Sequence, residues 1–195
     1  MSDAASRAQA LERALATPGG SAATALLAAA ETTIVAADDP RVLDPLAPFV
    51  ARLLAHGARP GRLELVVIPG ASVAATRSSV TARFPGLRVH VHDPARATWF
   101  TLPVSGATIA LSDVLRESEA IVLAGMASPG DRASLTRLLV PGLASAAAPG
   151  EEGPRVAAQV AERLAIDAVI AFDPRDPARA YCGALAGLDD EAAWS

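Results

Sequence analysis

The sequence predicts one α/β domain in three layers, with a mostly parallel sheet between helices on both of its faces. Short β-branched apolar runs alternate with segments whose apolar residues recur at helical spacing. The connections between these segments are short, as expected for strand–helix–strand units. The length of 195 residues suits a single domain, and 51% hydrophobic with 19% charged residues suits a packed core.

Turn residues separate five expected elements in the first third of the chain. These are helices to residue 16 and over 21–30, a strand over 32–37, a helix over 45–56 and a strand over 63–68. Thr17-Pro18-Gly19-Gly20 is expected to stop the first helix, and Ser21 to cap the second. Gly57 occupies the usual position of a C-terminal cap. The run 32–37 is β-branched and apolar, which indicates a buried parallel strand ending at Asp38.

The middle of the chain continues the alternation, and Ser72 and Ser112 stand where helix N-caps belong. The expected elements are a helix over 72–83, strands over 87–91 and 98–104, a helix over 112–117, a strand over 120–124 and a helix over 131–140. A loop rich in Ala, Pro and Gly follows over 141–153.

The last segments complete a Rossmann-like pattern. Pro154 opens a helix to residue 165, and strands are expected over 168–172 and 180–185. The turn residues between these two strands predict an antiparallel C-terminal hairpin. Ligands of such sheets bind beyond the carboxyl ends of the strands, so the loops after Ala37, Ile68 and Ala124 are the candidate site.

Composition excludes several classes of function. The net charge of −4 offers no basic surface for nucleic acid or an anionic membrane. No apolar run approaches the ~20 residues of a transmembrane helix, and the N-terminus lacks a signal sequence, so a cytoplasmic location is expected. Cys182 has no cysteine partner. All 17 basic residues are arginine, which excludes chemistry that needs a lysine amine.

The first candidate loop carries Asp38 and Arg41, and two interpretations stay open. Arg41 offers a planar fork for a carboxylate or phosphate, and Asp38 could accept a hydrogen bond from a hydroxyl. Alternatively, Asp38 or Asp39 caps the following turn and Arg41 is a solvated charge. In the second loop, Ser72 is expected mainly as a helix cap, although its amides could hold a phosphate.

The three histidines do not predict a metal site. His56 is expected to interact with the C-terminal end of a helix. His90 and His92 alternate along a strand and so share one face, where they could present two metal ligands. Only Asp93 stands beside them, whereas a metal site needs three or four ligands.

Several segments together resemble the first domain of the nickel-dependent lactate racemase family. They are Ala14 to Ser21, Asp38 with Arg41, Leu65 to Gly70, His92-Asp93, Ile121 to Gly125, Leu139-Val140-Pro141-Gly142 and Val156 to Gly187. The resemblance spans most of the chain in the family's order. It implies one lactate-racemase-like N-terminal domain over residues 1–195, without the family's second domain.

The resemblance also implies which functions are kept. Asp38 and Arg41 fall on the family's D-x-x-R motif, whose side chains contact the 2-hydroxy acid substrate. The family's catalytic histidine would fall on Ser72. The lysine that carries its nickel-pincer nucleotide would fall on Arg137, and the segment that supplies a nickel-binding histidine is reduced to the 141–153 loop. The resemblance therefore implies a relative without cofactor or metal, with Asp38, Arg41, Ser72 and Arg137 as candidate substrate-binding residues.

Three functions remain open. The first is a catalytically inactive module that binds a small carboxylate, or that associates with a protein partner or another copy over its exposed cleft face. The second is a 2-hydroxy acid racemase that acts with a complementing chain or cofactor. The third is a domain that retains only its fold.

Overall fold

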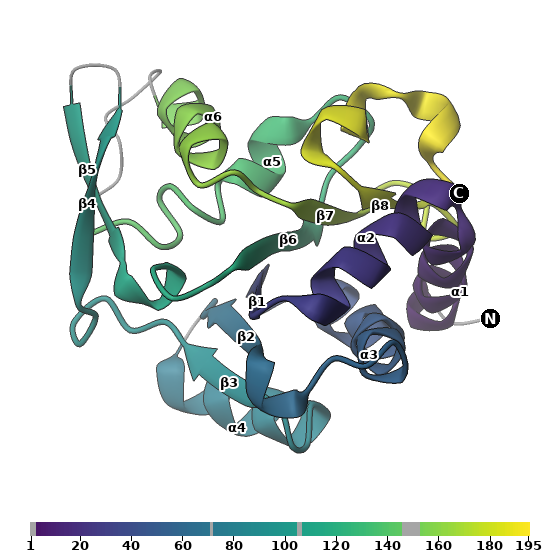
Figure 1. Ribbon diagram of the computed structural model, residues 1–195, viewed down its shortest axis with the longest axis horizontal. Coiled ribbons are helices and arrows are strands. Elements are labelled where there is room, and N and C mark those ends of the chain that lie inside the picture. The colour runs from purple at the N-terminus through teal and green to yellow at the C-terminus, as the bar shows by residue number, and fades with distance from the viewer. Residues whose placement is uncertain (1–2, 71, 105–106, 146–152) are drawn as a thin grey trace.

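A six-stranded sheet forms the centre of the molecule (Figure 1). The structure, a computed structural model, describes residues 3–70, 72–104, 107–145 and 153–195. The strands lie in the order β3-β2-β1-β6-β7-β8. Their bounds are Arg88–Val91 for β3, Leu63–Ile68 for β2, Thr32–Ala37 for β1, Ala120–Met126 for β6, Ala168–Phe172 for β7 and Ala180–Gly183 for β8.

The pairing confirms the predicted fold class. All neighbours from β3 to β7 pair in parallel, and β8 pairs antiparallel with β7 to form the predicted C-terminal hairpin. The parallel strands are apolar because helices cover both faces of the sheet. Two charged residues depart from this pattern, Glu64 in the otherwise apolar β2 and Arg88 in the edge strand β3.

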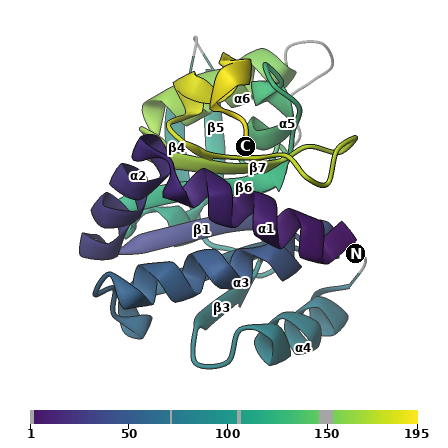
Figure 2. The ribbon, with the colours of Figure 1, turned by 90° about the vertical axis from the view of Figure 1, so that its right-hand side faces the viewer.

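Helices cover the two faces in separate layers (Figures 1 and 2). On one face lie α1 Asp3–Ala16, α2 Pro18–Ala29, α3 Pro40–Ala55 and α4 Val73–Arg83. On the other face lie α5 Arg132–Thr136 and α6 Gly153–Arg163. Short 3-10 helices η1 Pro60–Arg62, η2 Asp113–Leu115, η4 Leu185–Asp189 and η5 Glu191–Ala193 complete the described segments.

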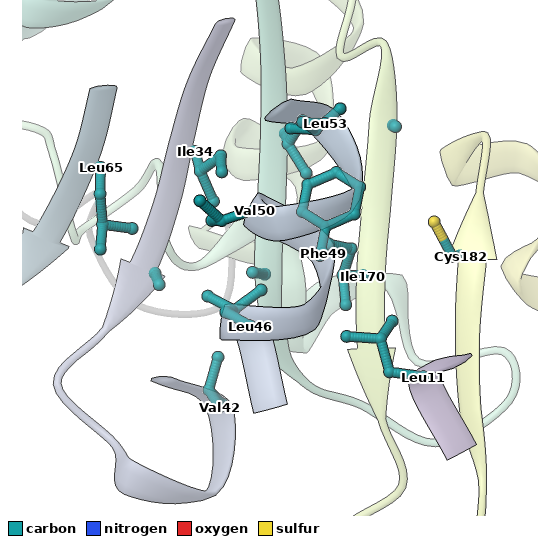
Figure 3. Close-up of a cluster of buried hydrophobic side chains, with 14 of the residues drawn as sticks. Leu11, Ile34, Val42, Leu46, Phe49, Val50, Leu53, Leu65, Ile170 and Cys182 are labelled. Carbon is teal, nitrogen blue, oxygen red and sulfur yellow. The ribbon is translucent and has the colours of Figure 1, made fainter. Parts of the chain in front are cut away.

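The core on the first face is built around α3. Phe49, Leu46 and Leu53 recur at helical spacing, are fully buried and pack toward Ile34 of β1 and Ile170 of β7 (Figure 3). Each such side chain contributes about 1.5–3 kcal/mol when removed from water. A helix face with this period therefore fixes α3 against the centre of the sheet.

One predicted strand lies outside the sheet. The segment predicted over 98–104 is β4, Trp99–Val104, and it pairs antiparallel with β5, Ala107–Ser112, in a separate hairpin at one end of the molecule (Figure 1). Strand β5 was not predicted, because Ser112 was expected to cap a helix. Ser112 instead ends β5, and only the short η2 follows, without the expected helix to residue 117.

Other differences concern helix ends. Thr17, not Ser21, caps α2, because the Gly20 N–H donates to Thr17 Oγ1 at 3.1 Å. Pro18 opens that helix, a position where proline loses no hydrogen bond. Gly20 is needed there, since a Cβ would lie 2.2 Å from the carbonyl oxygen of Ala14.

The helix predicted from Pro45 begins earlier, at Pro40, because Asp39 caps it. The helix predicted over 131–140 is shorter and ends at Thr136 as α5. Most of the predicted 141–153 loop, residues 146–152, and Ala71 of the second candidate loop lie outside the described residues. Within the described part of the chain, no helix has the length and apolar character to span a membrane.

Candidate functional site

The candidate loops lie at one edge of the sheet because β2, β1 and β6 are neighbours. Asp38 and Arg41 follow β1, Ser72 follows β2, and Arg137 follows β6. The first two loops are joined directly, since the Asp38 N–H donates to the Ile68 carbonyl oxygen at 2.9 Å. This carboxyl edge is where the sequence analysis placed the site.

Asp38 is held by α4. The buried Thr76 hydroxyl donates to the Asp38 carboxylate. One turn earlier, Ser72 Oγ accepts the Ala75 N–H at 3.2 Å and caps α4, as predicted. These contacts connect the loops after β1 and β2, and they occupy part of the hydrogen-bonding capacity of Asp38 and Ser72.

Arg41 is paired with its own neighbour. Its guanidinium forms a bidentate contact with Asp39, with Nη2 at 2.7 Å from Oδ2, and the Arg41 N–H donates to Oδ1. The hydrogen bond from Arg41 holds the pKa of Asp39 below its usual value. The helix cap considered in the sequence analysis is therefore Asp39, and contact of Asp38 or Arg41 with a ligand stays a prediction.

Arg137 lies at the C-terminal end of α5, and its side chain is exposed. Among the described residues its guanidinium has no hydrogen bond or ion pair. Its carbonyl oxygen accepts the Gly142 N–H at 3.0 Å. A Cβ on Gly142 would lie 2.6 Å from Ile68 Cδ1, so glycine lets this turn pack against the end of β2. Arg137 is thus carried by a turn fixed to the carboxyl edge.

Sequence reasoning missed Arg7 at the same edge. Arg7 lies on α1, is 3% exposed, and donates from Nη1 to the carbonyl oxygen of Asp173, just after β7, at 2.7 Å. Its charge also contributes to the lowered pKa of Asp39. An arginine in an Ala-rich helix that also carries Arg13 gives no sequence signal for this contact, which joins residues 166 positions apart.

The histidines have separate surroundings. His92 is 1% exposed, its ring lies edge-on to Trp99 at 5.9 Å, and neither ring nitrogen has a hydrogen-bond partner among the described residues. Burial lowers the pKa of His92, which favours the neutral ring. His90 lines a different, polar cavity. The described residues include no cluster of three His, Cys, Asp or Glu side chains able to hold a metal ion.

The main cavities lie away from the four candidate residues. One of about 490 Å³ lies at the opposite, amino edge of the sheet, and one of about 250 Å³ lies between α3 and the end of α4. A third, open cavity of about 820 Å³ runs along α4. None of these three is lined by Asp38, Arg41, Ser72 or Arg137. At the carboxyl edge, Arg41, Gly70 and Arg137 are exposed to solvent.

Comparison with known proteins supports the fold. No protein-family model and no curated protein matches the sequence. Among solved structures, the chain is similar to the lactate racemase apoprotein from Thermoanaerobacterium thermosaccharolyticum, with a TM-score of 0.63 and 14% sequence identity. The match covers 92% of this chain and 52% of that one, so this chain spans about half the length of its structural neighbour. The likeness establishes a lactate-racemase-like fold.

Proposed function

We propose that this chain is a non-catalytic binding domain that recognises a small carboxylate, such as a 2-hydroxy acid, at the carboxyl edge of its sheet. The observation that supports the proposal is the placement of these residues: Asp38 with Arg41 and Ser72 stand in the loops after the neighbouring strands β1 and β2, and the turn after Arg137 packs at Gly142 against the end of β2. Arg137 is the principal anchor, because its exposed guanidinium, which has no partner in the described part of the chain, can donate two hydrogen bonds to a carboxylate. Arg41 can contact the ligand carboxylate only if its guanidinium is shared between that carboxylate and Asp39.

A covering partner belongs to the same proposal. Arg41 and Arg137 are exposed at this edge, and a carboxylate bound by solvated guanidinium groups alone is held weakly. A second copy or another protein over this edge would exclude water and strengthen the contacts. Sedimentation velocity with and without D- or L-lactate measures this directly, and the expected result is assembly promoted by the ligand.

The residues do not fit the nickel-pincer group of the family that the chain resembles. The chain has no lysine, and Arg137 cannot form the covalent link because its guanidinium stays protonated. The Ser72 hydroxyl, already capping α4, offers no general base. We therefore derive no catalytic step through nickel or the nucleotide.

Calorimetric titration of the full chain with D-lactate, L-lactate and glycolate tests the binding function. We expect saturable binding that Arg137→Gln weakens by about tenfold, the effect of losing one charge-assisted contact. Arg155→Gln, an exposed arginine of α6, is the matched control and should leave the affinity unchanged. Unchanged binding in Arg137→Gln, or no binding in the native chain, would refute the proposal.

A polarimetric assay separates the competing enzyme function. The chain is incubated with one lactate enantiomer, nickel and the pincer nucleotide, and the other enantiomer is measured. We expect no interconversion above the rate without protein. Racemisation that the native chain supports would favour the alternative of a racemase acting with an added cofactor.

A further inference from the structure

A polar cavity of about 490 Å³ lies at the amino edge of the sheet, opposite the proposed carboxylate site. Its floor is the start of β1, β2 and β3, and its other wall is formed by η2 with the segments before β4 and after η2. The volume is in the range of small-molecule sites. The cavity is thus large enough for a metabolite and separate from Asp38 and Arg137.

The floor of this cavity is a polar row across three parallel strands. Thr33, Glu64 and Arg88 are register partners in β1, β2 and β3, so their side chains lie on one face. The next row on that face is Val35, Val66 and His90, of which both valines are buried core residues. This face of the sheet therefore changes from buried core to polar cavity lining over two residues along each strand.

Most charges at the cavity already have partners. Arg62 Nε lies 3.3 Å from Glu31 Oε1, Arg116 Nη1 lies 3.5 Å from Asp113 Oδ1, and Arg96 Nε lies 3.8 Å from Asp93 Oδ2. Glu64, Glu117 and Arg88 differ, because none of them forms a hydrogen bond or ion pair with another described residue.

The unpaired groups are close enough to interact electrostatically. Burial raises the pKa of Glu64. The charges of Arg88 and His90 lower this pKa, and the charge of Glu117 raises it further. Glu64 is half-buried on the cavity floor, so its carboxylate loses hydration without gaining a partner. Two carboxylates against one guanidinium leave an excess of negative charge, which a cationic ligand would neutralise.

Other ligand classes fit these groups less well. A bound metal ion needs three or four converging ligands, and no such cluster exists among the described residues. A phosphate or dicarboxylate would meet two negative side chains and one positive one. An ammonium group instead donates three hydrogen bonds, which two carboxylates and the nearby hydroxyl groups can accept. The Ser118 and Thr33 hydroxyl groups, 2.6 Å apart, lie beside the same row.

We propose that this cavity binds a small basic amino acid. Its side-chain ammonium group would lie between Glu64 and Glu117, and its carboxylate would lie on Arg88. The ligand's net positive charge matches the excess negative charge of the unpaired side chains. This site is distinct from the carboxylate site of the proposed function and does not depend on it.

Calorimetric titration of the full chain with L-lysine tests the proposal. L-norleucine is the matched ligand, because it has the same chain length without the terminal ammonium group. We expect L-lysine to bind at least about tenfold more tightly than L-norleucine, as the loss of a charged hydrogen bond would give. Equal affinity for the two ligands, or no binding of L-lysine, would overturn the proposal.

Variants locate the site. Glu64→Gln and Glu117→Gln should each weaken L-lysine binding by about tenfold or more. Glu117 is exposed, so its variant also tests the site if Glu64→Gln folds poorly. Glu162→Gln, at an exposed position of α6, is the control and should bind L-lysine as the native chain does. Arg137→Gln should also leave L-lysine binding intact, which separates failure here from failure of the carboxylate site.

Discussion

The two edges of the sheet both carry charged residues and differ in which of these charges already have partners. At the carboxyl edge, Asp38 accepts from Thr76 and Asp39 holds Arg41, which leaves Arg137 as the unpaired charge among the four candidate residues. At the amino edge, Glu64, Glu117 and Arg88 line a cavity, and none of them has a hydrogen-bond or ion-pair partner within the described segments. A residue with unused hydrogen-bonding capacity therefore indicates a binding site more directly than a residue that only occupies the expected position in the fold.

The largest expected effect is at the carboxyl edge, where backbone packing is tight. A Cβ in Gly142→Ala would lie 2.3 Å from the Leu138 carbonyl oxygen and 2.6 Å from Ile68 Cδ1. We expect the free energy of unfolding to fall by about 3 kcal/mol, measured by urea denaturation. Gly61→Ala at the amino edge is the control, because nothing lies within 4 Å of its added Cβ. Equal stability of both variants would contradict the difference in packing.

Thr76→Val tests the hydrogen bond that holds Asp38. The buried hydroxyl is lost while the side-chain volume is nearly kept, so we expect a loss of about 1–2 kcal/mol in unfolding free energy. Thr76→Ser retains the hydroxyl and should restore much of that loss. Chemical denaturation of the two variants measures the difference, and a valine variant as stable as native would show that this bond contributes nothing.

Glu64→Gln tests the unpaired carboxylate at the amino edge through pH. The pKa of Glu64 is raised in the folded chain, so folding favours its protonated form. Burial of the Glu64 carboxylate therefore destabilises the fold fully at a pH above the pKa of Glu64 in the folded chain. This destabilisation disappears as the pH falls to the pKa of Glu64 in the unfolded chain and below. We expect the variant to be more stable than native at neutral pH, and the gain to vanish toward pH 4. Arg88, His90 and Glu117 are the charges that modulate this titration.

Thermal unfolding between pH 4 and pH 8 measures this dependence, with Glu162→Gln as an exposed control whose stability should not change with pH relative to native. A gain that is constant across this range would show that Glu64 is not destabilised by burial.

The smallest effect is expected for Arg41→Gln. The guanidinium is 58% exposed, and an exposed ion pair contributes less than about 1 kcal/mol even in bidentate geometry. Asp39 keeps its capping bond to the backbone, so α3 should stay intact. The pKa of Asp39 should rise toward its ordinary value, which NMR titration of the carboxyl carbon measures. A large loss of stability would contradict the surface role of this pair.

Local patterns in the sequence were enough for the main sheet. The buried runs 32–37, 63–68, 120–124 and 168–172 lie in the predicted strands, because continuous apolar segments bounded by turns have few alternatives in an α/β domain. Strand β4 was predicted, but β5 and the pairing of the two strands in a separate hairpin were missed, since these strands carry a mixed pattern and pair with each other outside the main sheet. Whether a strand joins the sheet depends on partners that local sequence does not specify.

The candidate site shows the same division. The positions of Asp38, Arg41 and Ser72 in loops after strands followed from the alternation of strands and helices, whereas Arg137 was singled out only by the family resemblance. Their partners were not, because Thr76, Arg7 and Gly142 reach the edge from separate elements. Glu64 was visible as a charge in an apolar strand, but its lack of a partner required knowledge of every side chain around it.

The sequence by itself determined the alternation of strands and helices and the absence of any lysine, because both depend only on the order and type of residues. The tertiary structure decided which charges are neutralised and which stay unpaired, because a hydrogen bond or ion pair requires two groups to meet within a few ångströms. Some of these contacts join residues far apart in sequence, as the hydrogen bond from Arg7 to the Asp173 carbonyl oxygen does.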